Sequence, residues 1–361
     1  MKLSWRISQR RLASCVVSGS FIALLINPAA ASAETVRPSN FESVIGEITP
    51  STKDITVKVL AGDAYLQVTA EQGTTVQIPG YDGEPYLRIT ADGNVEQNRR
   101  SPAVILNSSR SSMMSSDTGS DMGEPLRSNR FPEGVSSKAA PEFVQVGSGG
   151  KVAWHDHRIH WMLSDPPATS SDQVAQDWIV PMTVNGEEVT VTGQLLYRPN
   201  VFPWTGILAV LIAAVAAWLA RSSQARLLLL LAAGLCAATL SLGALFGTAP
   251  TTQSSQPVLL TWLPLGLSLA AAATIVFAIG ARHLSRQVRM IILPLLSIAA
   301  LAGWAAPRLG LFWMPVVPSI FVDFIERGGT AFVIGVIAGA SLAILIRPIP
   351  SELVGLVHRQ H

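Results

Sequence analysis

The chain has few cysteines and few charged residues. It contains 2 cysteines in 361 residues, and charged residues make up only 14% of it. With 49% hydrophobic residues and a mean hydropathy of +0.37, this balance excludes an ordinary soluble protein and predicts apolar surface that faces lipid. Cys15 lies in the N-terminal segment described next. Loss of that segment leaves Cys236 alone, which excludes an intrachain disulfide in the mature protein.

The N-terminal residues have the order of a secretory signal. Four basic residues precede an apolar run from Leu12 to Ile26, and small residues follow as far as Ala33. This order predicts a signal peptide over residues 1–33 that is cleaved before Glu34. We therefore expect residues 34–200 to be exported.

After residue 200 the sequence becomes strongly apolar. We predict a membrane domain over 201–347, followed by a cytoplasmic tail over 348–361. Each predicted span is close to the ~20 residues that cross a hydrocarbon core of ~30 Å. The five spans are 203–220, 227–248, 258–280, 290–306 and 330–346.

The segment Leu309–Ile325 is apolar, but Pro315, Pro318 and Asp323 interrupt it. We interpret it as an interfacial or re-entrant loop on the outer face. The alternative is a sixth span, which would place the C-terminus on the outside.

Arginines in the loops predict the orientation in the membrane. They lie in the first and third loops and after the last span, whereas residues 249–256 of the second loop carry no charge. With the N-terminal domain outside, all of these arginines are cytoplasmic, as the positive-inside rule requires. We expect a multi-pass plasma-membrane protein with residues 34–200 extracytoplasmic and a cytoplasmic C-terminus.

The five predicted spans contain no ionisable residue, which argues against an ion or proton pump. Two pairs of glycines, Gly243 with Gly247 and Gly335 with Gly339, have the spacing that allows helices to approach closely. We expect packing within the bundle. The alternative is homo-oligomer formation through these glycines.

The exported region has the pattern of an all-β domain. Short alternating segments separated by turns predict an antiparallel sandwich, Ig-like or cupredoxin-like, with a flexible Ser-rich insertion at about 107–141. Asn185-Gly186 predicts a hairpin. Acidic residues outnumber basic ones in this region, which argues against nucleic-acid binding. The predicted strands are 55–60, 65–69, 75–78, 86–91, 103–106, 143–146, 152–161, 178–184 and 189–197.

Three of the six histidines of the chain lie between Trp154 and Met162. On a strand, His155 and His157 point to the same face, where they would chelate one Cu or Zn ion. His160 falls on the opposite face unless a bulge or turn intervenes. Asp156 is a candidate second-shell partner that would orient an imidazole. The alternative, which regular alternation favours, is a structural polar cluster whose imidazoles diverge.

The spacing of these histidines matches part of the metal-binding motif of metallo-β-lactamase-like hydrolases, but Ile159 stands in place of its aspartate. The remaining histidines, His283, His358 and His361, are predicted to be cytoplasmic. We therefore expect no catalytic residues and lean against an enzyme.

The segments Gly80–Arg88 and Arg100–Pro102, together with the Trp154–Met162 block, resemble recurring segments of uncharacterised actinobacterial envelope membrane proteins. The resemblance covers most of the exported domain and implies the layout of signal peptide, β-domain and C-terminal spans. It implies no activity. We expect Glu84 either to pair with Arg88 or to contact a partner.

The function predicted from the sequence is that of a non-enzymatic cell-envelope membrane protein. Its exported β-domain would bind a protein partner or support a membrane assembly, with the lipid bilayer as its other partner. The alternative is an exported copper- or zinc-binding module involved in metal handling.

Overall fold

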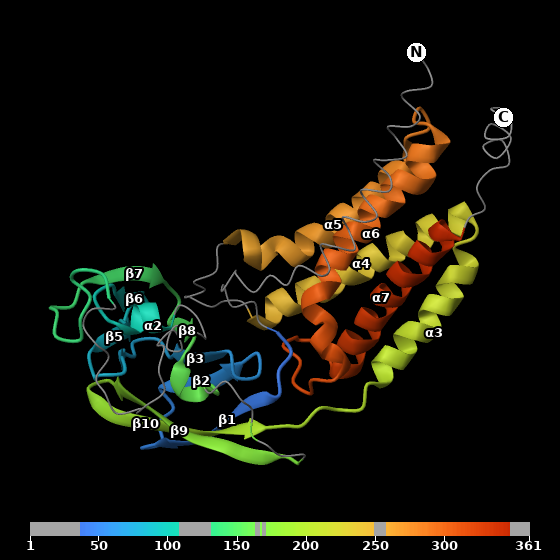
Figure 1. Ribbon diagram of the computed structural model, residues 1–361. Coiled ribbons are helices and arrows are strands. Elements are labelled where there is room, and N and C mark those ends of the chain that lie inside the picture. The colour runs from blue at the N-terminus through green and yellow to red at the C-terminus, as the bar shows by residue number, and fades with distance from the viewer. Residues whose placement is uncertain (1–36, 108–130, 163–166, 168–170, 249–257, 347–361) are drawn as a thin grey trace, which may run out of the picture.

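A computed structural model describes residues 37–107, 131–162, 167, 171–248 and 258–346. A β-domain precedes a helical bundle, and the two meet at one end of the bundle (Figure 1). The predicted signal peptide, most of the predicted Ser-rich insertion and all of the predicted C-terminal tail lie outside the described residues.

The β-domain is built from two antiparallel sheets, which confirms the sandwich-like β-class prediction. The larger sheet has the order β1 (Phe41–Thr49), β10 (Glu187–Tyr197), β9 (Gln173–Val184), β4 (Val76–Pro79), β5 (Pro85–Ile89), β6 (Val95–Asn98), β7 (Phe143–Gly147). The smaller sheet has the order β2 (Ile55–Leu60), β3 (Tyr65–Ala70), β8 (Lys151–Trp154). The finer assignment to an Ig-like or cupredoxin-like fold stays a prediction.

Alternation of side chains places one face of each strand in a common core. In β10, for example, Val189, Val191, Gly193 and Leu195 are buried, while the residues that alternate with them are partly or fully exposed. Asn185 and Gly186 both have positive φ and join β9 to β10, which confirms the predicted hairpin.

Two strand predictions need correction, and two further strands were missed. Residues Ala103–Leu106 form the short helix α2, because Pro102 presets a helical φ and the Ser101 hydroxyl accepts the N–H of Ala103. The strand predicted over 152–161 ends at Trp154. Strands β1 and β6 were not predicted. The pairing of β1 with β10 shifts register between Ile45 and Ile48, which interrupts its alternation.

All five predicted spans are helical. Four helical segments are long and apolar enough to cross a membrane, whereas α3 is a shorter apolar helix of 16 residues. The five-span count therefore stays a prediction. The bundle helices are α3 (Trp204–Leu219), α4 (Ser223–Thr248), α5 (Val258–Gly280), α6 (Leu293–Ala305) and α7 (Asp323–Leu345). A π-helical turn (Val288–Ile292) precedes α6 and a 3-10 turn (Ala306–Phe312) follows it.

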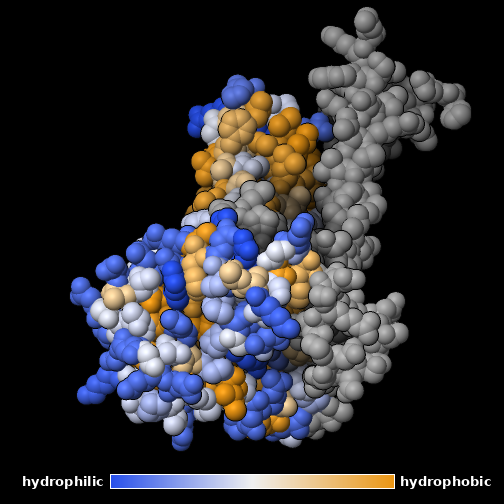
Figure 2. All heavy atoms as spheres, turned by 90° about the vertical axis from the view of Figure 1, so that its left-hand side faces the viewer, coloured by the Kyte–Doolittle hydropathy of each residue, from blue (hydrophilic) through white to orange (hydrophobic). Residues whose placement is uncertain are grey.

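The surface changes character between the two parts. Hydrophobic residues dominate the bundle surface in Figure 2, whereas hydrophilic residues cover most of the β-domain. This difference is consistent with a multi-pass membrane protein whose β-domain lies outside the lipid.

Glycines on α7 allow close packing inside the chain. A Cβ atom at Gly335 would lie 2.8 Å from the Ala209 carbonyl oxygen, and one at Gly339 would lie 2.5 Å from that of Ala213. Helix α3 therefore covers this face, and these two glycines are not available to a second copy. Gly243 faces Phe321 of the same chain. The surroundings of Gly247 lie outside the described residues.

The predicted spans carry no ionisable residue, but helix α7 extends beyond the last of them. Helix α7 begins at Asp323, seven residues before the predicted span, and so includes Glu326 and Arg327 as well. Arg327 is 2% exposed and donates to the carbonyl oxygens of Leu311, Met314 and Pro315. These carbonyl acceptors stabilise Arg327 inside the helix. A span predicted from uninterrupted apolar residues leaves such an arginine out.

Candidate functional site

The segment after β8 turns back on itself and brings the three histidines together. The strand ends at Trp154, and His157–Ile159 form a single 3-10 turn. The Asp156 carboxylate caps this turn by accepting the Arg158 backbone N–H at 2.9 Å. The turn returns His160 to the same side as His155.

The imidazoles consequently converge. The ring centroids of His155 and His160 are 4.0 Å apart, and those of His155 and His157 are 5.1 Å apart with nearly perpendicular planes. The predicted divergence of the imidazoles is wrong, because the strand ends at Trp154 and a 3-10 turn follows it. The sequence allowed His160 to join the other two histidines only if a bulge or turn intervened, and the 3-10 turn meets this condition.

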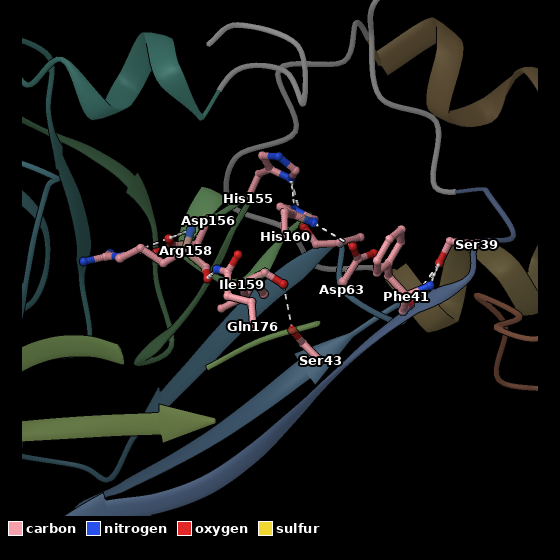
Figure 3. A network of polar contacts seen from close by, with 11 residues as sticks. Ser39, Phe41, Ser43, Asp63, His155, Asp156, Arg158, Ile159, His160 and Gln176 are labelled. Atoms are coloured by element: carbon pink, nitrogen blue, oxygen red, sulfur yellow. Dashed lines mark hydrogen bonds and ion pairs between the residues drawn. The ribbon is translucent and has the colours of Figure 1, made fainter. Parts of the chain in front are cut away.

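Asp63, His155, His157 and His160 together form what we call the histidine cluster. Asp63 comes from the turn between β2 and β3, 97 residues before His160. Its Oδ2 lies 3.0 Å from His160 Nδ1, and His160 Nε2 lies 2.9 Å from His155 Nδ1. Figure 3 shows His160 between the other two side chains. All four residues are at most 4% exposed.

The acceptors around the cluster assign the imidazole tautomers. The Asp63 carboxylate accepts from His160 Nδ1–H, so His160 Nε2 is left as an acceptor in the neutral ring. His155 Nδ1 lies 2.9 Å from both His160 Nε2 and the Ala64 carbonyl oxygen, and its proton is shared between them. Two imidazoles and one carboxylate thus form a continuous hydrogen-bonded series.

The same hydrogen bond bears on the predicted metal site. Two imidazole nitrogens that bind one tetrahedral ion with bonds of ~2.0–2.1 Å lie roughly 3.3 Å apart, without a proton between them. Here the two nitrogens share a proton at 2.9 Å. Among the residues that the structure describes, no group of three or more His, Cys, Asp or Glu side chains is arranged to hold a metal. Copper or zinc binding by His155, His157 and His160 stays a prediction, and it requires loss of the proton between His155 and His160.

Asp156 does not orient an imidazole, so its predicted second-shell role needs correction. It accepts from Trp154 Nε1 at 2.7 Å and forms a bidentate ion pair with Arg158. Burial by itself would raise the pKa of Asp156, but the Arg158 charge and these hydrogen bonds outweigh it and lower the pKa to about 2. Asp63 is instead the carboxylate that orients an imidazole, and no local sequence signal marked it.

Tyr81 closes the other side of the cluster. Its hydroxyl accepts the His157 backbone N–H at 2.9 Å and donates to Asn107 Oδ1. Burial, followed by the nearby Asp156 charge, raises the pKa of Tyr81 well above its usual value, so the hydroxyl keeps its proton. Sequence reasoning missed this contact as well.

Glu84 has a different partner from either that the sequence suggested. It accepts from Ser101 Oγ at 2.6 Å and from the Asp82 backbone N–H at 3.1 Å. Arg88 pairs with Glu96 instead. Glu84 is only 5% exposed. Its hydrogen bonds to Asp82 and Ser101 connect the turn between β4 and β5 to the residue before α2.

The histidine cluster lies next to the contact between the β-domain and the bundle. Gly62, which precedes Asp63, has φ +83°, and a Cβ atom there would lie 2.6 Å from Val316 Cγ1. Val316 and Ser39 exchange two backbone hydrogen bonds of 3.2 and 3.0 Å. We call this contact, comprising Ser39, Gly62 and Val316, the junction.

The junction is fixed from both sides. From the β-domain, the Ser43 backbone N–H donates to the Gly62 carbonyl at 3.0 Å, and Ser43 Oγ donates to the Ile159 carbonyl at 2.7 Å. From the bundle, Arg327 holds the carbonyls of residues 314 and 315 directly before Val316. An unbroken series of contacts therefore links α7 to the histidine cluster.

Comparison of the chain with protein families, curated proteins and solved structures found no match.

Proposed function

We propose that the chain is an integral membrane protein of a cell envelope whose β-domain is a non-enzymatic binding module. The bundle holds this domain in one orientation, and there it binds a protein partner or supports a membrane assembly. The series of contacts from Arg327 through Val316 and Gly62 to the histidine cluster is the observation that carries the proposal. Such a rigid mount suits a module that must present its surface at a defined angle.

Burial of the histidine cluster supports a structural role over a catalytic one. Substrate must reach a catalytic group, yet His155, His157 and His160 are 2%, 4% and 0% exposed. Their hydrogen bonds instead fix the turn that carries Gly62. We also propose the relationship to actinobacterial envelope proteins, on the segments that resemble them.

Photo-crosslinking of the full chain in its native membrane tests partner binding. The crosslinking residue would replace Val44, Val174 or Ile179, which are 43%, 47% and 59% exposed on β1 and β9. Val276, 56% exposed on α5, is the lipid-facing control. We expect a discrete protein adduct from at least one β-domain position and only lipid adducts from Val276. Absence of protein adducts from all three β-domain positions would contradict the proposal.

The proposed orientation places the β-domain outside and the C-terminus in the cytoplasm. The export signal and the arginine-rich loops support it. Reporter fusions after Asn200, Gln256 and His361 should report outside, outside and inside, respectively. An external signal at His361 would overturn the five-span count.

Metal handling is a second candidate, which convergence of the three imidazoles favours. A metal ion would have to displace the shared proton between His155 and His160. Titration of the purified full chain with Cu(II) and Zn(II) tests it, with a His155→Ala/His157→Ala double variant as the control. Equal affinity of the two proteins would eliminate the histidine cluster as a metal site.

A further inference from the structure

Several large apolar side chains are exposed near the end of the bundle that meets the β-domain. Six of them are between 37% and 71% exposed, although they lie outside the long apolar stretches of the helices or at their first residues. We call them the apolar collar: Phe202, Trp204, Trp313, Ile320, Val322 and Phe324.

The apolar collar is assembled from three separate segments of the chain. Trp204 is the first residue of α3 and Phe324 the second of α7, and their rings stack with centroids 5.9 Å apart and planes at 14°. The Val201 backbone N–H donates to the Trp313 carbonyl at 2.8 Å, which ties the linker before α3 to the segment before α7. These contacts bring together the starts of α3 and α7, which lie at the end of the bundle nearest the β-domain (Figure 1).

Continuity with the lipid-facing helices identifies what covers this surface. The collar begins where α3 and α7 begin, so an apolar surface passes from the helices to the collar. Yet Asp323, with its side chain 56% exposed, lies among the collar residues, and residues 313–322 belong to no helix or strand. Exposed carboxylates and irregular backbone need water, which the hydrocarbon core does not supply.

These two requirements meet at the lipid headgroups. Tryptophan and phenylalanine contribute apolar rings to this zone, and water remains available there to polar groups. We propose that the apolar collar lies in the headgroup region of the bilayer on the β-domain side, with residues 313–325 as an interfacial segment. The collar then fixes the depth of the bundle and places the base of the β-domain on the membrane surface. This inference holds whichever side of the membrane the β-domain occupies.

Spin labelling of the full chain in phosphatidylcholine nanodiscs tests the inference. Both native cysteines, Cys15 and Cys236, would be replaced by serine. Single cysteines would then replace Ile320 or Val322 in the collar. Ile179 offers a matched control, because it is 59% exposed on the β-domain and Ile320 is 57% exposed. The measurement is collision of each nitroxide with oxygen, which concentrates in lipid, and with a water-soluble nickel complex.

We expect labels at positions 320 and 322 to show a severalfold loss of nickel accessibility and a gain of oxygen accessibility relative to position 179. Equal nickel accessibility at all three positions would overturn the inference, because the collar would then face water. Low accessibility to both reagents, with spin–spin broadening that disappears on dilution with unlabelled chain, would also overturn it. That result would show a second copy on the collar.

Discussion

Replacing His160 by alanine should weaken the β-domain at the junction. His160 is fully buried and hydrogen-bonds both Asp63 and His155. A hydrogen bond to a charged group contributes ~1.5–3 kcal/mol, a neutral one about 1 kcal/mol, and Asp63 would lose its imidazole donor. We therefore expect the local opening free energy to fall by about 3 kcal/mol.

Hydrogen exchange of the full chain measures this change where it occurs. A loss of about 3 kcal/mol accelerates exchange roughly a hundredfold, and the Ser43 amide, which donates to the Gly62 carbonyl, reports on the junction. Amides of the β9–β10 ladder far from the cluster should change much less. In the matched variant His160→Asn, the amide group can still donate to Asp63, so we expect a smaller effect. Exchange at Ser43 unchanged in His160→Ala would refute the structural role of the cluster.

Three further perturbations follow from the same contacts. The pKa of Asp156 lies at about 2, below its ordinary 3.8, so the stability it contributes is present above about pH 4 and is lost as the pH falls through 2. Thermal unfolding should show Asp156→Asn to be about 2 kcal/mol less stable than the unsubstituted chain at pH 7, and this difference should shrink below pH 4. A difference that does not depend on pH would contradict the prediction. Gly62→Ala should lower the free energy of unfolding by roughly 1–2 kcal/mol more than Gly73→Ala. Both glycines have positive φ, but only Gly62 is close to Val316. Equal unfolding temperatures of the two variants would exclude a close junction. Arg327→Met should accelerate hydrogen exchange of the Val316 amide, since the arginine no longer holds the preceding carbonyls, and unchanged exchange would remove Arg327 from the series of contacts.

Local patterns were sufficient to predict most of the elements. Strand β2 matches the predicted 55–60, and α5 matches the predicted 258–280, because side-chain alternation and long apolar runs are local properties. Asn185-Gly186 likewise identified its hairpin, since few other residue pairs accept two positive φ angles.

The organisation of the histidine cluster could not be predicted in the same way. Its three histidines are neighbours in the sequence, but Asp63 is 97 residues away and reaches His160 only because β3 pairs with β8. The turn that returns His160 depends on the Asp156 carboxylate, which accepts the Arg158 backbone N–H and stabilises a turn in place of a continued strand.

The start of α7 illustrates a second limit. Asp323, Glu326 and Arg327 precede the apolar run, so the predicted span 330–346 begins seven residues after the helix does. Arg327 is accommodated in the helix because its guanidinium donates to the carbonyls of Leu311, Met314 and Pro315 and pairs with the Asp323 carboxylate. Such tertiary compensation leaves no mark in a hydropathy pattern.

An electron–electron distance measurement tests most directly whether the bundle holds the β-domain in one orientation. Spin labels at Ile179 on β9 and Leu228 on α4 are both on exposed positions, 59% and 61%, in the two parts of the chain. In nanodiscs, the account predicts a single narrow distance distribution that broadens in the Arg327→Met variant. A broad distance distribution in the chain whose junction residues are unsubstituted would show that the β-domain moves freely relative to the bundle. That result would contradict a fixed orientation.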